Sequence, residues 1–270
     1  MSSTTISSDD TGNDDFASMK KILMDTKVDG KKSVWAATLE TFGMADGKTK
    51  KHDVIVDDLE KGIKLLNEYV TETQKNDPAK LYWALVPLSQ FGATKEDFLA
   101  SFLKWAEKDI CCQEADKPKK VQINVSKALR RLDCYFEWMN DNYADLKEPL
   151  TVDSISAAAK VWDIQVTYDE KGQFVWWIDL GSMDRKAVKA IDTKDHLRYV
   201  VWFSHLVMFD AKARNNGAII VEDMGHLGFW SMCTLLPHDL SVKMDRLTIG
   251  ILPVKMKAIY VFGAAAWMSM

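Results

Sequence analysis

The second half of the chain alternates short apolar strands with helical patterns, and this alternation limits the fold more than any other feature. Apolar runs typical of buried strands cover residues 174–180, 218–221 and 257–262. Between them, apolar residues recur every three or four positions over 193–214 and 240–251, which predicts two helices. Strands joined by helices indicate an α/β fold with a mostly parallel β-sheet and flanking helices.

The preceding residues have a helical character. Apolar positions over 59–70 fall on one helix face, Thr94–Asp97 has the pattern of a capping box, and 125–138 carries a broad apolar stripe. We therefore predict a helical N-terminal lobe over 17–150 and an α/β lobe over 151–270.

The first sixteen residues are acidic and predict a disordered tail over 1–16. Their four Asp residues match the whole net charge of −4, so the remainder is neutral and carries no overall basic field for nucleic acid. This segment has neither the basic region nor the apolar region of a signal peptide, and the four cysteines are too few for a disulfide scaffold. A cytoplasmic location is the resulting expectation.

Motifs for catalysis and metal binding are weak. Glu222 and Asp223 follow a predicted strand, where a cleft could hold a carboxylate, but no nucleophile or partner base accompanies them. His226, Cys233 and His238 lie close in sequence with a spacing that matches no zinc template. We expect no catalytic residues, no metal and no cofactor, and hence a protein that is not an enzyme.

Four segments, in this order, resemble the CRAL-TRIO family of lipid-binding and lipid-transfer proteins. Residues 125–138 are similar to the last helix of its N-terminal lobe, and 169–184 resemble its D-x-x-G hairpin, which continues to a Gly and an Asp. Residues 215–223 resemble its Asn-Gly-apolar-strand-Asp segment, and 252–259 its Pro-x-Lys-x-Lys-x-Ile segment. The family continues beyond the point that matches Met270, so the resemblance implies an α/β lobe that is incomplete at its C-terminal end.

The resemblance implies a protein that holds one hydrophobic lipid in an apolar cavity over the sheet. Such a protein shields the lipid, which could be a phospholipid, tocopherol or retinoid, and transfers it between membranes, as in phosphatidylinositol transfer. A monomer in transient, peripheral contact with an anionic membrane surface is expected. Apolar burial supplies the binding energy in such a cavity. The residues leave the identity of the lipid open.

The resemblance also assigns residues to the site. Lys255 and Lys257 match basic residues that meet phosphoinositide headgroups in the tocopherol-transfer branch. Glu222 stands where the family often has an apolar residue, and a carboxylate there needs a partner or selects a polar ligand. The positions that match the cavity lining are Leu197, Val200, Ser204, Ala218, Ile220, Met244, Leu247, Val254 and Ile259.

Two other functions remain open. A non-catalytic interaction or scaffold module could keep the fold without lipid exchange, and the missing C-terminal part and Glu222 favour it. A small-molecule enzyme that uses Glu222 or Asp223 ranks below both, because no nucleophile or metal ligand set accompanies them. A co-purifying lipid would separate the first function from the other two.

Overall fold

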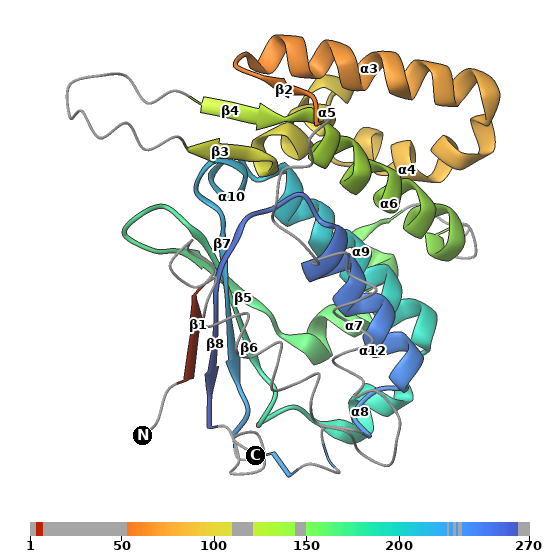
Figure 1. The fold of residues 1–270 in the computed structure, drawn as a ribbon. Helices are drawn as coiled ribbons and strands as arrows, with labels where there is room; N and C mark the ends of the chain where they lie inside the picture. Colours follow the sequence, from red (N-terminus) through yellow and green to blue (C-terminus); the bar gives the residue numbers. More distant parts are fainter. Residues whose placement is uncertain are drawn as a thin grey trace, which may run out of the picture.

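The computed structural model describes residues 4–7, 53–109, 121–143, 150–225, 227–228, 231 and 234–263, which form a helical lobe and an α/β lobe (Figure 1). The helices are α3 (Leu59–Asn76), α4 (Pro78–Gln90), α5 (Lys95–Trp105), α6 (Val125–Tyr143), α7 (Val152–Trp162), α8 (Arg185–Ala190), α9 (Thr193–Phe209), α10 (Ala211–Asn216), α12 (His238–Asp245) and the π-helical turn η3 (Arg246–Ile251). The strands are β1 (Thr4–Ser7), β2 (Ile55–Val56), β3 (Glu107–Asp109), β4 (Val121–Asn124), β5 (Gln165–Tyr168), β6 (Phe174–Asp179), β7 (Ala218–Asp223) and β8 (Met256–Phe262).

The helical lobe packs α3 to α6 around an aromatic core. Phe98, Phe102 and Tyr135 are fully buried, and the rings of the first two meet edge to face with centroids 5.1 Å apart. The predicted capping box is confirmed: the Asp97 amide donates to the Thr94 hydroxyl at 3.0 Å, and the Thr94 amide donates to the Asp97 carboxylate at 3.4 Å. Capping satisfies amides that the first turn of α5 leaves without partners.

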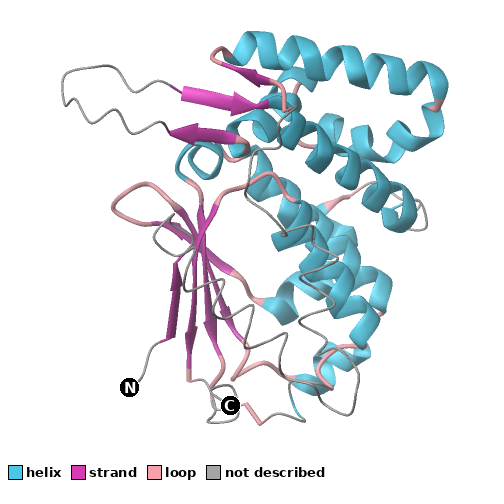
Figure 2. Cartoon of the chain, in the orientation of Figure 1, coloured by secondary structure: helices cyan, strands magenta, loops and turns pink. Residues whose placement is uncertain are grey.

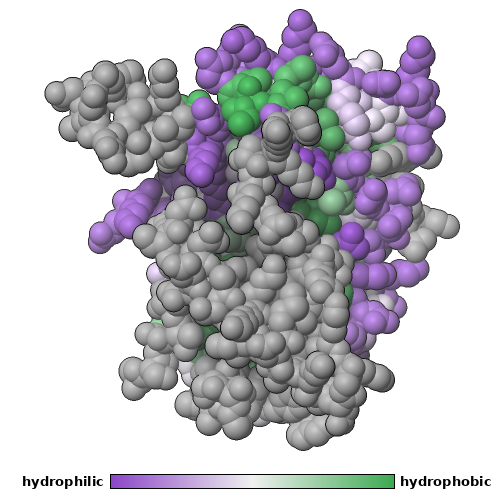
Figure 3. Space-filling view, in the orientation of Figure 1, coloured by the Kyte–Doolittle hydropathy of each residue, from purple (hydrophilic) through white to green (hydrophobic). Residues whose placement is uncertain are grey.

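Besides its helices this lobe contains three short strands, β2, β3 and β4, that the sequence does not predict. A small antiparallel sheet has the order β2-β4-β3 (Figure 2). Figure 3 shows hydrophobic surface at the top of the view, in the helical lobe, and the exposed apolar side chains of this lobe include Val54, Ile55 and Leu65. Strands of two to four residues are too short for their periodicity to reveal them.

The α/β lobe contains a five-stranded sheet of order β1-β8-β7-β6-β5. The central strands β6, β7 and β8 are parallel, as predicted, but β5 and β1 pair antiparallel at the two edges. The sheet is therefore partly rather than mostly parallel. The predicted turn at Asp169–Gly172 is present and joins β5 to β6 as a hairpin, because the Asp169 carboxylate accepts from the Lys171 and Gln173 amides.

Four residues of the predicted disordered tail form a strand. Thr4–Ser7 pair antiparallel with β8, with Thr4 opposite Val261 and Ser7 opposite Ala258. The edge of β8 offers unpaired backbone groups to any extended segment, so the pairing needs no apolar sequence. The other residues of 1–16 lie outside the described part of the chain.

The two faces of the sheet differ in what they contact. Trp176 is 4% exposed and meets Phe203 of α9 edge to face at 5.7 Å, so this face lies against the helices. Trp177 points to the opposite face, as strand alternation predicts, where it is 42% exposed and stacks on Phe262. The buried side chains of that opposite face form a separate cluster whose described members all belong to strands.

The predicted helix over 193–214 is two helices. Asp210 has extended backbone (φ −66°, ψ 124°), which ends α9, and its carboxylate accepts from the Ala213 amide at 2.7 Å, which begins α10. The cap of α9 is Asp192, whose carboxylate accepts from the Lys194 amide at 2.8 Å. An Asp can end one helix and begin the next because its side chain competes for backbone amides.

Arg131 of α6 joins the two lobes. Its guanidinium donates to the carbonyl oxygens of Ile249, Ile251 and Leu252 at 3.1, 3.0 and 2.7 Å. The same guanidinium lies 4.1 Å from the centroid of the Trp105 ring. Three carbonyls at the end of η3 are thereby satisfied by a charged donor from the other lobe.

Candidate functional site

The nine residues that the resemblance assigns to a cavity converge on one region of the molecule. We call this region the sheet–helix layer: it lies between the helix-facing side of β7 and β8 and the elements α9, α12, η3 and the loop before β8 (Figure 1). Eight of the nine are at most 8% exposed, and Ile259 is partly buried. All but Ser204 belong to the main apolar core, which also extends through the helical lobe. Their role as ligand contacts stays a prediction.

The strand register shows which side chains of β7 and β8 lie on the same face of the sheet. Ala218 and Ile220 of β7 alternate with Ile219, so they share the face that Glu222 also uses. Ile220 lies opposite Ile259 of β8, and Glu222 lies opposite Val261. The sheet therefore presents an apolar surface to the helices that ends in one carboxylate.

The periodicity of α9 shows which of its side chains share a helix face. Leu197, Val200 and Ser204 recur at intervals of three and four, so they share a helix face. His205 points elsewhere, because its Nδ1 bonds to the Val201 carbonyl and its Nε2 to the Tyr135 hydroxyl of α6. The α9 contact with the sheet that the structure shows is made by Phe203, whose ring meets Trp176 of β6, and α9 also contacts α12 and η3.

Ser204 carries a buried hydroxyl with no hydrogen-bond partner. Its side chain is 1% exposed, and no donor or acceptor of the described residues lies within reach of Oγ. Serine hydroxyls in helices often bond to the preceding turn, as Ser101 does to the Asp97 carbonyl in α5. An unmatched buried hydroxyl costs free energy, so it marks a place where the layer is incomplete.

Two carboxylates act on each other across the layer. Burial and the charge of Asp245, the last residue of α12, raise the pKa of Glu222 to about 7. Burial raises the pKa of Asp245 to about 6. No cation of the described residues affects either pKa, and neither carboxylate has a hydrogen-bond partner among them. Both side chains keep some accessible surface, so solvent can reach these carboxylates.

Asp223 does not join this pair. Its carboxylate accepts from the Gly225 amide at 2.9 Å, and strand alternation directs it to the opposite face from Glu222. The two residues considered for catalysis therefore do not share a site. His226 and Cys233 lie outside the described residues, and within these no three His, Cys, Asp or Glu side chains form a group that could hold a metal.

The predicted headgroup lysines lie at the end of the sheet nearest the helical lobe. Lys255 precedes β8 and Lys257 is its second residue, and both are next to Gly217, where an added Cβ would lie 2.5 Å from the Lys255 carbonyl oxygen. Burial and the charges of Arg131 and Lys255, in that order, lower the pKa of Lys127 of α6. The structure thus brings Lys255 close to a basic group of the other lobe.

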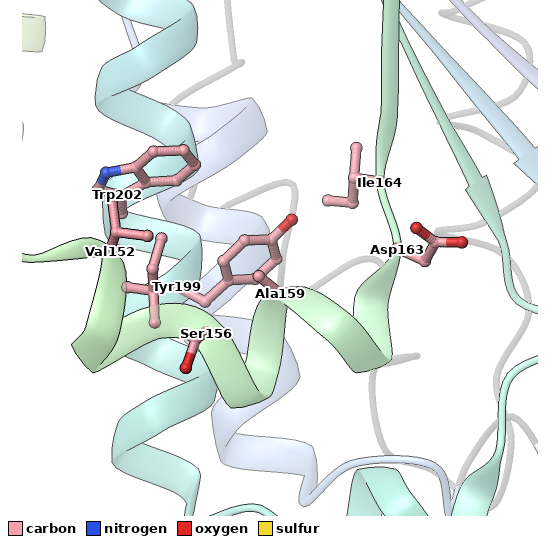
Figure 4. Close-up of a pocket in the computed structure, with 8 residues that line it drawn as sticks. Val152, Ser156, Ala159, Asp163, Ile164, Tyr199 and Trp202 are labelled. Carbon is pink, nitrogen blue, oxygen red and sulfur yellow. The ribbon is translucent and has the colours of Figure 1, made fainter.

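Two pockets are formed by the described residues, and both lie outside the sheet–helix layer. One, of about 260 Å³, lies between α7 and α9, where Tyr199 and Trp202 face α7 and the Tyr199 hydroxyl is directed toward Ile164 (Figure 4). The other, of about 300 Å³, includes His196, whose Nδ1 accepts from the Trp162 indole and whose Nε2 donates to the Val188 carbonyl. None of the nine predicted ligand contacts lines either pocket.

Three contributors to this region were not found from the sequence. Asp245 and Arg131 read as ordinary charges of amphipathic helices, and only the packing of α12 and α6 shows what they face. The unmatched state of Ser204 likewise depends on neighbours from other elements. An acidic residue directly after an apolar stripe was the one available signal for Asp245.

Within the described part of the chain, no helix is both long enough and apolar enough to cross a membrane. Comparison of the chain with models of known protein families and with curated proteins finds no match.

Proposed function

We propose that this protein binds one hydrophobic ligand, a lipid, in the sheet–helix layer and shields or transfers it without catalysis. Support comes first from burial: residues chosen from four separate segments of the sequence are all buried or partly buried, and all but Ser204 belong to the main apolar core. Its walls come from β7, β8, α9, α12 and η3, and aliphatic side chains dominate it. Such walls favour ligands that bind by apolar burial.

The observation that carries the proposal is a buried polar group of this layer, the Ser204 hydroxyl, which has no hydrogen-bond partner among the described residues. A core that only stabilises the fold rarely retains such a group, because it lowers stability. Glu222 adds a partly exposed carboxyl group to the same face of β7 as Ala218 and Ile220. A ligand with a polar head and an apolar body would satisfy the hydroxyl and bury against the aliphatic side chains.

The lysines supply a second feature that this function uses. Lys255 and Lys257 lie beside Gly217, and Lys127 and Arg131 of the helical lobe are close to Lys255. A cluster of cations of this kind attracts the anionic headgroups of a membrane surface. We propose that this end of the molecule makes the transient membrane contact that lipid exchange requires.

The test compares two neighbouring substitutions that differ only in the face they alter. The purified chain is incubated with liposomes of mixed phospholipid, sterol and tocopherol, re-isolated by gel filtration, and extracted for mass spectrometry. Ile220→Trp fills the layer from β7, whereas Ile219→Trp adds the same volume on the opposite face. Thermal unfolding of both variants checks that they remain folded, since overpacking also destabilises.

We expect lipid at one equivalent in the wild type and in Ile219→Trp, and its loss in Ile220→Trp. Equal loading of both variants would place the ligand outside the layer and contradict the proposed site. A folded wild type that takes up no lipid would contradict the function and favour an interaction or scaffold module.

A further inference from the structure

The pocket between α7 and α9 combines an aromatic wall with a carboxylate (Figure 4). We propose that it binds a small aromatic amine, whose ring lies against Tyr199 and Trp202 and whose ammonium group bonds to Asp163. The pocket is separate from the sheet–helix layer, so this proposal stands or falls independently of lipid binding.

The walls of this pocket favour a flat apolar body. Tyr199 and Trp202 of α9 stack with their ring centroids 6.4 Å apart and an interplanar angle of 18°, so they form a continuous aromatic surface. Ile155, Ala159 and Ile164 also line the pocket. The face of an aromatic ring attracts both other rings and cations. The volume of about 260 Å³ lies just below the range of about 300–1,000 Å³ typical of ligand sites, which limits the ligand to one ring with a short chain.

Asp163 brings a carboxylate to this pocket from the position that ends α7. Its backbone is left-handed (φ 41°, ψ 45°), and among the described residues it alone has a positive φ without being a glycine. Glycine is the most frequent residue at such a helix end, because a side chain is strained there. A carboxylate is also unfavourable beside the partial negative charge of a helix C-terminus. Asp is therefore a destabilising residue at this position, and a bound cation would offset its charge.

The neighbouring polar groups leave this carboxylate available to a ligand. Gln165 Nε2 donates to Oδ1 of Asp163 at 2.8 Å, which leaves Oδ2 open within the part of the chain that the structure describes. Lys160, the basic residue in the last turn of α7, is exposed and does not line the pocket. An ammonium group in the pocket therefore meets a carboxylate for which no lining residue supplies a competing cation.

The Tyr199 hydroxyl offers a second polar contact. Tyr199 is 4% exposed, its hydroxyl is directed toward Ile164, and no described residue bonds to it (Figure 4). Burial and then the charge of Asp163 raise the pKa of this hydroxyl to about 12, so it is protonated at neutral pH. A phenol group both donates and accepts, and a ligand in the pocket would supply the partner that the protein does not.

The test uses three probes with one ring and different heads: 2-phenylethylamine, 2-phenylethanol and 3-phenylpropanoate. Their dissociation constants are measured at pH 7.5 by isothermal titration calorimetry, and thermal unfolding checks that each variant is folded. Asp163→Asn removes the charge but keeps the oxygen that accepts from Gln165, and asparagine tolerates left-handed backbone. Ala159→Leu fills the pocket. The matched controls are Asp153→Asn and Ala157→Leu, at exposed positions of α7 that do not line the pocket.

We expect 2-phenylethylamine to bind the wild type at least about tenfold more tightly than 2-phenylethanol, with 3-phenylpropanoate the weakest. Asp163→Asn should remove most of this preference and leave the affinity for the alcohol unchanged, whereas Asp153→Asn should change neither. Ala159→Leu should abolish binding of all three probes, and Ala157→Leu should not. Equal affinity for amine and alcohol, equal effects of the two Asp substitutions, or no binding to the folded wild type would overturn the proposal.

Discussion

Replacing Glu222 by Gln should stabilise the ligand-free protein at alkaline pH and change little at acid pH. The reason is that burial and the charge of Asp245 raise the pKa of Glu222 to about 7 in the folded chain, whereas an unfolded Glu titrates near 4.5. The carboxyl group therefore favours the folded state while it is protonated. This contribution is fully present below pH 4.5 and is lost as the pH rises through 7.

The size of the effect follows from the difference between the two pKa values. A change from 4.5 to about 7 corresponds to about 3 kcal/mol over the whole titration, and about 2 kcal/mol of it falls between pH 5 and pH 8. Glu222 is only partly buried by its accessible surface, so the measured value should lie at or below this figure. A Gln has nearly the same shape and does not titrate.

Urea denaturation at pH 5, 6, 7 and 8 provides the measurement. The unfolding free energy of Glu222→Gln relative to the wild type should increase by about 1–2 kcal/mol from pH 5 to pH 8. Glu170→Gln is the matched control, since Glu170 is exposed in the β5–β6 turn. If the difference in unfolding free energy between Glu222→Gln and the wild type were the same at every pH, the raised pKa of Glu222 and its burial as the cause would be refuted.

Three further substitutions test the contacts that position the layer. Tyr135→Phe removes the hydroxyl bonded to His205 Nε2 at 2.6 Å, and urea denaturation at pH 8 should show a loss of about 1–3 kcal/mol; an unchanged midpoint would contradict that bond. Arg131→Met leaves three carbonyls of the α/β lobe without a donor and should lower the unfolding free energy by about 3 kcal/mol or more in the same assay. Arg130→Met, at an exposed position, should lower it by less than about 1 kcal/mol. Equal losses would contradict the role of Arg131 in joining the two lobes. Gly217→Ala should lower the melting temperature by several degrees by calorimetry, because φ is +84° and the new Cβ would lie 2.5 Å from a carbonyl oxygen; an unchanged temperature would show that this turn is not tight.

Periodicity predicted the elements that are long and bury one face. α3 and α6 follow their apolar stripes, and β6, β7 and β8 follow their apolar runs. α4 was not predicted, because its apolar residues are nearly continuous and Pro87 is a helix-breaking signal. Pro87 has no amide to donate to the carbonyl four residues earlier, and the helix ends one turn later at Gln90.

Breaks within helical patterns depend on single side chains. One apolar stripe continues through Asp210, so nothing in the periodicity separates α9 from α10; the carboxylate that caps Ala213 makes the division. The stripe over 240–251 likewise hides the change from α12 to the π-helical turn η3, in which the Leu252 amide donates to the Leu247 carbonyl at 2.8 Å. Arg131 holds the end of that turn from the other lobe, a contact that local sequence cannot indicate.

The candidate site could be predicted in its apolar part but not in its polar part. The resemblance selected nine residues that are buried or partly buried, and the strand register puts Ala218 and Ile220 on one face of β7. The effect of Asp245 on the pKa of Glu222 depends on how α12 packs in the fold, which local sequence does not indicate. The same packing leaves Ser204 without a partner.

Native mass spectrometry of the chain purified under non-denaturing conditions tests the central claim most directly. The account predicts a species heavier than the 270-residue polypeptide by the mass of one lipid, which solvent extraction identifies and Ile220→Trp abolishes. A folded chain that shows only the polypeptide mass, as purified and after incubation with mixed liposomes, would contradict lipid binding in the sheet–helix layer.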